Sequence, residues 1–209
     1  MNRIMILLMA VLMMAFSSCL KDETNDQREL EMRILENYIS ENYPGVQPEE
    51  SGLYFIEDSA GTGLTPQDGD FVLINYTMFT VEDEEMVYSY DKEVAEDNNI
   101  FNERNLYGST KIMVGVNLTA IDIALKMMNE GGGARIIFPS DLGYGSYSVG
   151  NIPAYSSLIM DIQLLEVIPD PDARERSKID EYLAQNDIQQ DSTESGIYHI
   201  VLEEGTGDS

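Results

Sequence analysis

A long loop in the second half of the sequence carries residue types that are suited to binding another molecule. The stretch PSDLGYGSYSVGNIPAYS, residues 139–156, holds three glycines, two prolines and three tyrosines, and it has no Lys, Arg or Glu. Connections in compact domains usually run about 4–6 residues, and longer ones often have a function. We therefore expect this loop to line a site. The alternative is a long hairpin loop that packs on its own tyrosines.

The sequence offers little for covalent or metal chemistry. It has one histidine, His199, and one cysteine, Cys19. Ser-His-Asp and Cys-His catalysis need a histidine beside the nucleophile, and zinc sites need clustered His and Cys ligands. Acidic pairs such as Glu84-Glu85 are expected on a solvated surface, because the Asp-x-Asp-x-Asp-Gly pattern of calcium loops is absent. We expect no metal, no cofactor and no disulfide.

The segments on either side of the loop are typical of β-strands. ARIIF precedes it and SLIMDIQLLEV follows it, both with β-branched and alternating apolar residues. Upstream, DFVLINYTMFT also alternates, with Val72, Ile74, Tyr76 and Met78 on one face. The other expected elements are helices over 24–43 and 117–130, strands over 53–56 and 111–115, and an irregular flap over 81–109.

Five short motifs follow one another in this region: Gly131-Gly132, Pro139-Ser140-Asp141, Tyr144-Gly145, Ile152-Pro153 and Leu158–Leu165. Their order and spacing resemble the C-terminal half of the FK506-binding-protein (FKBP-type) family of peptidyl-prolyl cis-trans isomerases. The resemblance implies an α+β fold, in which a curved antiparallel β-sheet wraps a short helix and a prolyl pocket lies between them. The resemblance covers residues 51–168.

The resemblance also implies which residues carry the activity. Tyr76 stands where the family has a tyrosine on its second strand, although a core role for Tyr76 is equally open. Tyr144 matches the loop tyrosine that bonds ligand carbonyls, and Ile152 matches a residue whose backbone N–H meets the substrate carbonyl. We expect these three as catalytic residues of a reaction that needs no nucleophile, acid or metal, because it only rotates an amide bond.

Four further residues are expected to contact the substrate, and some depart from the family pattern. Leu118 matches the apolar residue that opens the helix. Ile121 replaces a tryptophan of the pocket floor, and Met160, which could also be a core residue, replaces a phenylalanine. The family's Phe-Asp pair corresponds either to Tyr88-Ser89 or to Tyr90-Asp91, and we take Tyr88 as the contact.

Composition and charge narrow the range of partners. The formal net charge is −26 and 43% of the residues are hydrophobic. The negative charge argues against nucleic acid, whose phosphates it would repel. The apolar fraction is enough for a folded core.

The first residues predict delivery to the bacterial cell envelope. Residues 1–18 have a short basic start and an apolar run, as in a signal peptide, and they lead to Cys19 in the sequence FSSC, which resembles a lipobox. We expect a lipid on Cys19 that anchors the protein to a membrane; the alternative is an ordinary signal peptide with a chance cysteine. Lys21-Asp22-Glu23 is similar to tracts that send some Bacteroidota lipoproteins to the surface. An outer-membrane protein facing the periplasm or the surface is therefore expected, with residues 19–50 as a tether and helix.

Residues 169–209 read as a linker followed by a truncated repeat. SGIYHIVLEEGTG, residues 195–207, matches SGLYFIEDSAGTG, residues 51–63, at 7 of 13 positions. One interpretation is the remnant of a lost second domain. The other is a helix and strand that are retained for self-association through Ile197–Leu202, which would pair with a sheet edge.

Two functions are consistent with these observations. The first is a peptidyl-prolyl cis-trans isomerase and folding factor that acts on proline-containing polypeptide clients, with activity weakened by the departures at the pocket. The second is a non-catalytic protein-binding module on a lipoprotein, in which the acidic flap and the partial repeat make the contacts.

Overall fold

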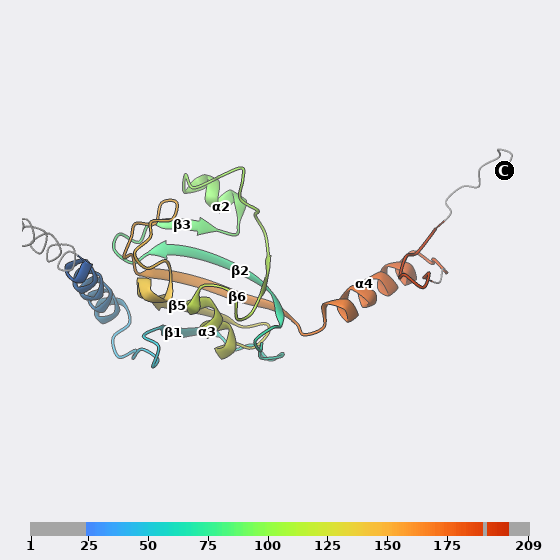
Figure 1. Ribbon diagram of the computed structural model, residues 1–209, viewed down its shortest axis with the longest axis horizontal. Helices are drawn as coiled ribbons and strands as arrows, with labels where there is room; N and C mark the ends of the chain where they lie inside the picture. Colours follow the sequence, from blue (N-terminus) through green and yellow to red (C-terminus); the bar gives the residue numbers. More distant parts are fainter. Residues whose placement is uncertain (1–23, 190–191, 201–209) are drawn as a thin grey trace, which may run out of the picture. The chain divides into compact units, whose positions relative to one another are not determined.

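The computed structural model describes residues 24–189 and 192–200 of the chain. The chain divides into two compact units after Pro169. The first unit contains the β-sheet, and the second contains α4 (Pro171–Gln185) (Figure 1).

The sheet of the first unit is six-stranded and antiparallel throughout, with the strand order β1-β5-β6-β2-β3 and with β4 also beside β2. The strands are β1 (Tyr54–Ser59), β2 (Phe71–Thr80), β3 (Met86–Ser89), β4 (Thr110–Met113), β5 (Gly133–Phe138) and β6 (Leu158–Ile168). The two longest strands, β2 and β6, lie side by side along the curved centre of the sheet (Figure 1). The α+β class expected from the sequence is confirmed.

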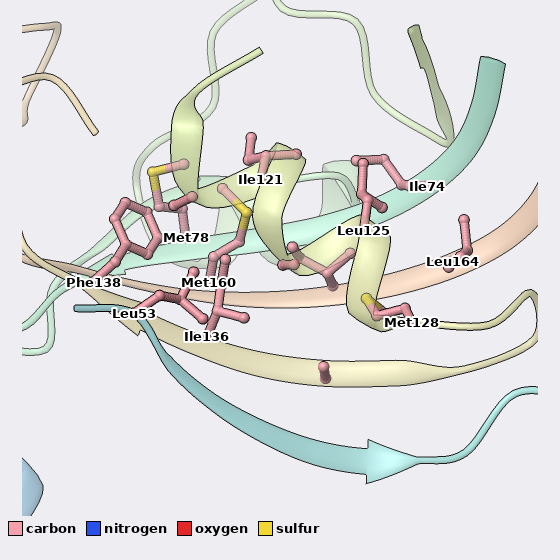
Figure 2. Close-up of a cluster of buried hydrophobic side chains, with 14 of the residues drawn as sticks. Leu53, Ile74, Met78, Ile121, Leu125, Met128, Ile136, Phe138, Met160 and Leu164 are labelled. Atoms are coloured by element: carbon pink, nitrogen blue, oxygen red, sulfur yellow. The ribbon is translucent and has the colours of Figure 1, made fainter. Parts of the chain in front are cut away.

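Helix α3 (Thr119–Met127) covers the inner face of the sheet. Its residues Ile121 and Leu125 pack with Met160 and Ile74 of the strands in one buried cluster (Figure 2). The alternation predicted for β2 is confirmed, because its inward residues join this cluster. The helix is shorter than the predicted 117–130, and the chain leaves it through a turn at Gly131, whose φ of 84° favours glycine.

The outer face of the sheet is covered by a second helix, which spans residues 24–42 of the described chain. Leu35 and Ile39 pack there against Tyr54, Ile137 and Ile159, which alternate with the inward residues along their strands. Burying each such aliphatic side chain stabilises a fold by about 1.5–3 kcal/mol. The helix expected in the tether region is therefore an integral layer of the first unit.

The flap and the tail differ from their predictions. Residues 81–109 are not irregular throughout, because they contain β3 and the short helix α2 (Lys92–Asp97), which Asp91 caps by accepting from the amides of Glu93 and Val94. The predicted strand Ile197–Leu202 is not formed over residues 197–200, and residues 201 and 202 lie outside the described part. A sheet-edge contact through this segment is therefore not supported.

The predicted signal peptide and Cys19 also lie outside the described residues. Among the helices of residues 24–189 and 192–200, none is both long and apolar enough to span a bilayer.

Two leucines of the outer helix give a test of its role. Leu35 is fully buried, whereas Leu30 is 49% exposed. We expect Leu35→Ala to lower the free energy of unfolding by about 2–5 kcal/mol, because it leaves a cavity under the helix. Leu30→Ala should change it by less than about 0.5 kcal/mol. Urea unfolding measures both, and equal effects would show that the helix is only a tether.

Candidate functional site

The inner face of the sheet and helix α3 bring the seven predicted site residues into one apolar cluster. The buried members are Ile121, Ile152 and Met160, and the partly buried members are Tyr76, Tyr88, Leu118 and Tyr144. Four of them lie on β2, β3, α3 and β6, Leu118 directly precedes α3, and two lie in the long loop before β6. Only the tertiary fold brings them together.

Tyr76 and Tyr88 pack against the apolar cluster and against each other. Their rings stack, with centroids 4.5 Å apart and an interplanar angle of 19°, because β2 and β3 pair with Met78 opposite Tyr88. The Tyr88 hydroxyl also donates to the backbone carbonyl of Leu106 at 3.4 Å. This bond ties the Tyr88 side chain to the segment between α2 and β4.

The two alternatives for the family's Phe-Asp pair take different places in the structure. Tyr88 packs against the apolar cluster, whereas Asp91 caps helix α2. Ser89 is buried, and its hydroxyl accepts a hydrogen bond from the Asp91 amide at 3.1 Å. The assignment of the family's pair to Tyr88-Ser89 stays a prediction, and in that assignment a neutral hydroxyl stands in place of the carboxylate.

Tyr144 is positioned by tight turns in the long loop. The loop begins with the short 3-10 helix η1 (Ser140–Leu142), and the Gly145 amide donates back to the Ser140 carbonyl at 2.8 Å. Within the described residues, the Tyr144 hydroxyl has no hydrogen-bond partner. Burial raises the pKa of the Tyr144 hydroxyl, so it remains a protonated donor at neutral pH. This hydroxyl is therefore available to bond a ligand carbonyl.

Ile152 lies at the tip of the loop, and its amide is already engaged. The Ile152 N–H donates to the Val149 carbonyl at 2.9 Å, and the Val149 N–H donates back to the Ile152 carbonyl at 3.0 Å. The Ile152 side chain is buried in the cluster. A role for its N–H toward a substrate would require this turn to open, and the role remains a prediction.

Ile121 and Met160 lie inside the buried cluster. Ile121 faces Met160 and Met78 between the helix and the sheet (Figure 2). Met160 has no exposed surface, so it cannot contact a substrate in this structure. This agrees with the core role that the sequence left open for Met160.

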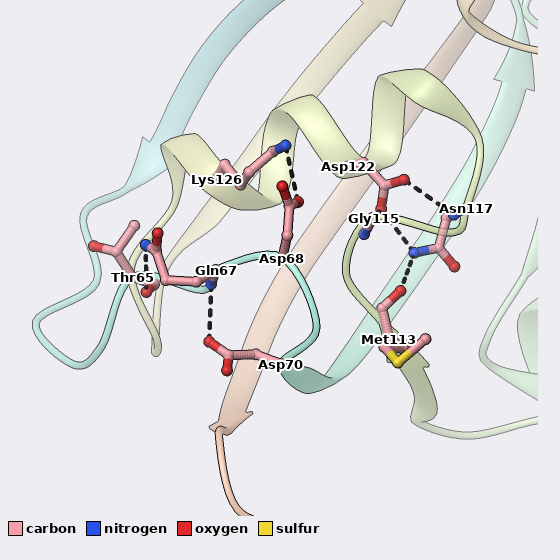
Figure 3. A network of polar contacts seen from close by, with 9 residues as sticks. All are labelled: Thr65, Gln67, Asp68, Asp70, Met113, Gly115, Asn117, Asp122 and Lys126. Carbon is pink, nitrogen blue, oxygen red and sulfur yellow. Dashed lines mark hydrogen bonds and ion pairs between the residues drawn. The ribbon is translucent and has the colours of Figure 1, made fainter.

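Hydrogen bonds around Asp122 order the chain just before α3. Asp122 accepts hydrogen bonds from the backbone amides of Gly115 and Asn117, at 2.9 and 3.0 Å. Asn117 in turn donates from its side chain to Asp122 and to the Met113 carbonyl, at 2.8 and 2.6 Å (Figure 3). These bonds hold the segment that leads from β4 into the helix.

Leu118 follows this network as the N-cap residue of α3, with no side-chain cap. Its backbone N–H has no partner within the described residues, and it lies at the positive end of the helix dipole. The signal for this donor in the sequence is weak: an apolar residue stands where Ser, Thr, Asp or Asn usually caps a helix.

A separate hollow of about 860 Å³ lies on the outer face of the sheet and contains none of the predicted site residues. Arg135 and Asp161 form a bidentate ion pair there, at 2.6 and 2.7 Å, and Arg135 also donates to the Tyr43 hydroxyl at 2.9 Å. These charged groups satisfy one another. In the described part of the chain, no group of three or more His, Cys, Asp and Glu side chains is arranged to hold a metal ion.

Comparison with known proteins points to one family. Residues 63–165 match the family model described as FKBP-type peptidyl-prolyl cis-trans isomerase. The FKBP-type peptidyl-prolyl cis-trans isomerase FkpA of Escherichia coli strain K12 is 29% identical over 136 residues, which are 65% of this chain and 45% of that protein. FkpA of Aeromonas hydrophila is 26% identical over 147 residues, 70% of this chain and 48% of that protein. The chain thus spans less than half the length of these curated relatives.

Solved structures share the fold. The crystal structure of FkpA from Escherichia coli is similar with a TM-score of 0.56 and 20% identity, over 81% of this chain and 72% of that one. A crystal structure of a peptidyl-prolyl cis-trans isomerase from Pseudomonas syringae pv. tomato gives a TM-score of 0.55 and 20% identity, over 69% of this chain and 96% of that one.

Proposed function

Because the domain formed by residues 63–165 belongs to the FKBP-type peptidyl-prolyl cis-trans isomerase family, we propose that this protein isomerises Xaa-Pro bonds in polypeptide clients. The observation that carries the proposal is the unpaired hydroxyl of Tyr144 at an apolar cluster that also contains Tyr76, Leu118 and Ile121.

The chemistry follows from the nature of the Xaa-Pro bond. Amide resonance imposes a rotation barrier of about 18–20 kcal/mol. An apolar site that removes water from the amide weakens this resonance, and a donor to the carbonyl stabilises the twisted state. The cluster supplies the apolar surface, and Tyr144 supplies a donor that is oriented before the substrate arrives.

We further propose that the second donor is the backbone N–H of Leu118 rather than that of Ile152. The Leu118 amide is unpaired at the start of α3, whereas the Ile152 amide is bonded to Val149. A free donor at a helix N-terminus needs no rearrangement to meet a carbonyl.

The departures from the family pattern favour weak activity. Ile121 fills less of the floor than a tryptophan, and Ser89 cannot supply the charge of an aspartate. A missing apolar contact in a pocket costs about 1–3 kcal/mol of discrimination. We expect slower isomerisation of standard peptides than in members that retain both residues.

One observation favours a second function, that of a non-catalytic protein-binding module. Tyr88 stacks over Tyr76 and is held by the Leu106 carbonyl, so a flap side chain covers part of the site. A folded protein that binds proline-containing peptides without isomerising them would establish this function instead.

A proline-isomerisation assay on the purified protein tests the enzyme. We expect Tyr144→Phe to lower kcat/KM roughly fivefold, because the lost hydrogen bond contributes about 1 kcal/mol. Tyr147→Phe is the matched control, because Tyr147 lies in the same loop and is 75% exposed. The raised pKa of Tyr144 keeps the hydroxyl protonated, so kcat/KM should not fall between about pH 7 and 9. Equal rates for both variants would remove Tyr144 from the mechanism.

The choice of amide donor is tested by replacing single residues with their α-hydroxy acids, which turns the N–H into an ester oxygen. At position 118 this change should lower kcat/KM about tenfold, and at position 152 less than about threefold, as expected for one hydrogen bond to the reacting carbonyl. The reverse order would assign the donor to Ile152.

We also propose that the protein is anchored in the bacterial envelope by a lipid on Cys19. The support is the apolar run of residues 4–16 and the small residues before the cysteine. Partitioning into detergent on phase separation of cell lysates measures the anchor. Cys19→Ser should move the protein into the aqueous phase, and an unchanged distribution would refute the anchor.

A further inference from the structure

A buried carboxylate joins the outer helix to the loop that carries the site. Glu31 lies on the helix of residues 24–42 and is only 6% exposed. It accepts hydrogen bonds from the Ser140 amide at 2.6 Å, the Ser140 hydroxyl at 2.7 Å and the Ser157 hydroxyl at 2.8 Å. Ser140 and Ser157 are themselves buried.

The two serines mark the two ends of the site loop. Ser140 opens η1 shortly after β5 ends at Phe138, and Ser157 directly precedes β6, which starts at Leu158. The segment that carries Tyr144 and Ile152 is therefore bonded to the same carboxylate at its start, just after β5, and at its end, just before β6. Inside the loop, the Tyr155 amide donates to the Gly145 carbonyl at 2.9 Å and closes it further.

This contact is more shielded from water than the ion pair between Arg28 and Asp141, which also joins the helix to the loop. Arg28 pairs with Asp141 nearby, but their side chains are 48% and 52% exposed, and exposed ion pairs contribute little. Glu31 is shielded from water and its hydrogen bonds are charge-assisted, which makes each about twice as strong as a neutral one.

The helix is also attached to the sheet by contacts that do not involve this carboxylate. Leu35 and Ile39 hold the helix on the outer face through apolar contacts with Ile137 and Ile159. A carboxylate is costly to bury, and apolar packing alone already secures the helix, so the specific effect of Glu31 is on the loop.

We propose that Glu31 is a positioning residue. It binds both ends of the site loop and thereby orders Tyr144, although the helix that carries Glu31 covers the opposite face of the sheet. The consequence for catalysis rests on the proposed isomerase function, whereas the ordering of the loop does not. The outer helix is then part of the machinery that shapes the site.

The test compares Glu31→Gln with Asp161→Asn in the full chain. Both replace a hydrogen-bonded carboxylate by an amide in the first unit, but Asp161 bonds Arg135 on the outer face and does not contact the loop. Ser157→Ala is a milder variant that removes one of the three donors. Amide hydrogen exchange is measured for residues 143–156 and for β2, together with urea unfolding and kcat/KM.

We expect Glu31→Gln to raise exchange in residues 143–156 about tenfold or more, with smaller changes in β2, as expected when bonds to a charged group are lost. Ser157→Ala should give an intermediate rise confined to the same residues, and Asp161→Asn should give none. In the two loop variants kcat/KM should fall as loop exchange rises.

Exchange that rises uniformly over β2 and the loop, in step with lost stability, would overturn the proposal, because Glu31 would then serve stability alone. Unchanged loop exchange in Glu31→Gln would overturn it as well. If the unmodified protein shows no isomerisation, the isomerase function fails, while the exchange pattern still decides whether Glu31 orders the loop.

Discussion

The structure depends on the need to cover both apolar faces of one antiparallel sheet. Along β5 and β6, successive residues alternate between two buried clusters: Ile136 and Met160 point inward, and Ile137 and Ile159 point outward. A sheet with two such faces is stable in water only when each is covered. Helix α3 covers the inner face, and the helix of residues 24–42 covers the outer one.

The site is a continuation of the inner core, and this limits what its residues can do. Ile121 and Ile152 are almost fully buried and Met160 is completely so, and they pack on the same strands that hold the fold together. An apolar surface that can remove water from an amide is the same kind of surface that builds a core. Within the described part of the chain, the hydroxyl of Tyr144 and the amide of Leu118 have no hydrogen-bond partner and can bond a ligand.

Polar contacts give the apolar site its shape. Asp122 orders the segment before α3 by accepting from the Gly115 and Asn117 amides, and Glu31 orders the loop by accepting from Ser140 and Ser157. Both are acidic residues in a chain of net charge −26. Asp122 orders the segment that carries the Leu118 amide, and Glu31 orders the loop that carries the Tyr144 hydroxyl. The helices that carry these two carboxylates cover opposite faces of the sheet.

The sequence by itself determined the features that depend on local spacing. Alternation predicted β2, β5 and β6, and the loop motifs around Tyr144 indicated the family, because strand periodicity and turn chemistry are written in neighbouring residues. Tertiary structure alone decided which tyrosine faces Tyr76, since the register of β3 places Tyr88 there. It also decided that the Leu118 amide is free while that of Ile152 is bonded. The link from Glu31 to Ser140 spans 109 positions, and a hydrogen bond between residues so far apart leaves no pattern in the sequence around either of them.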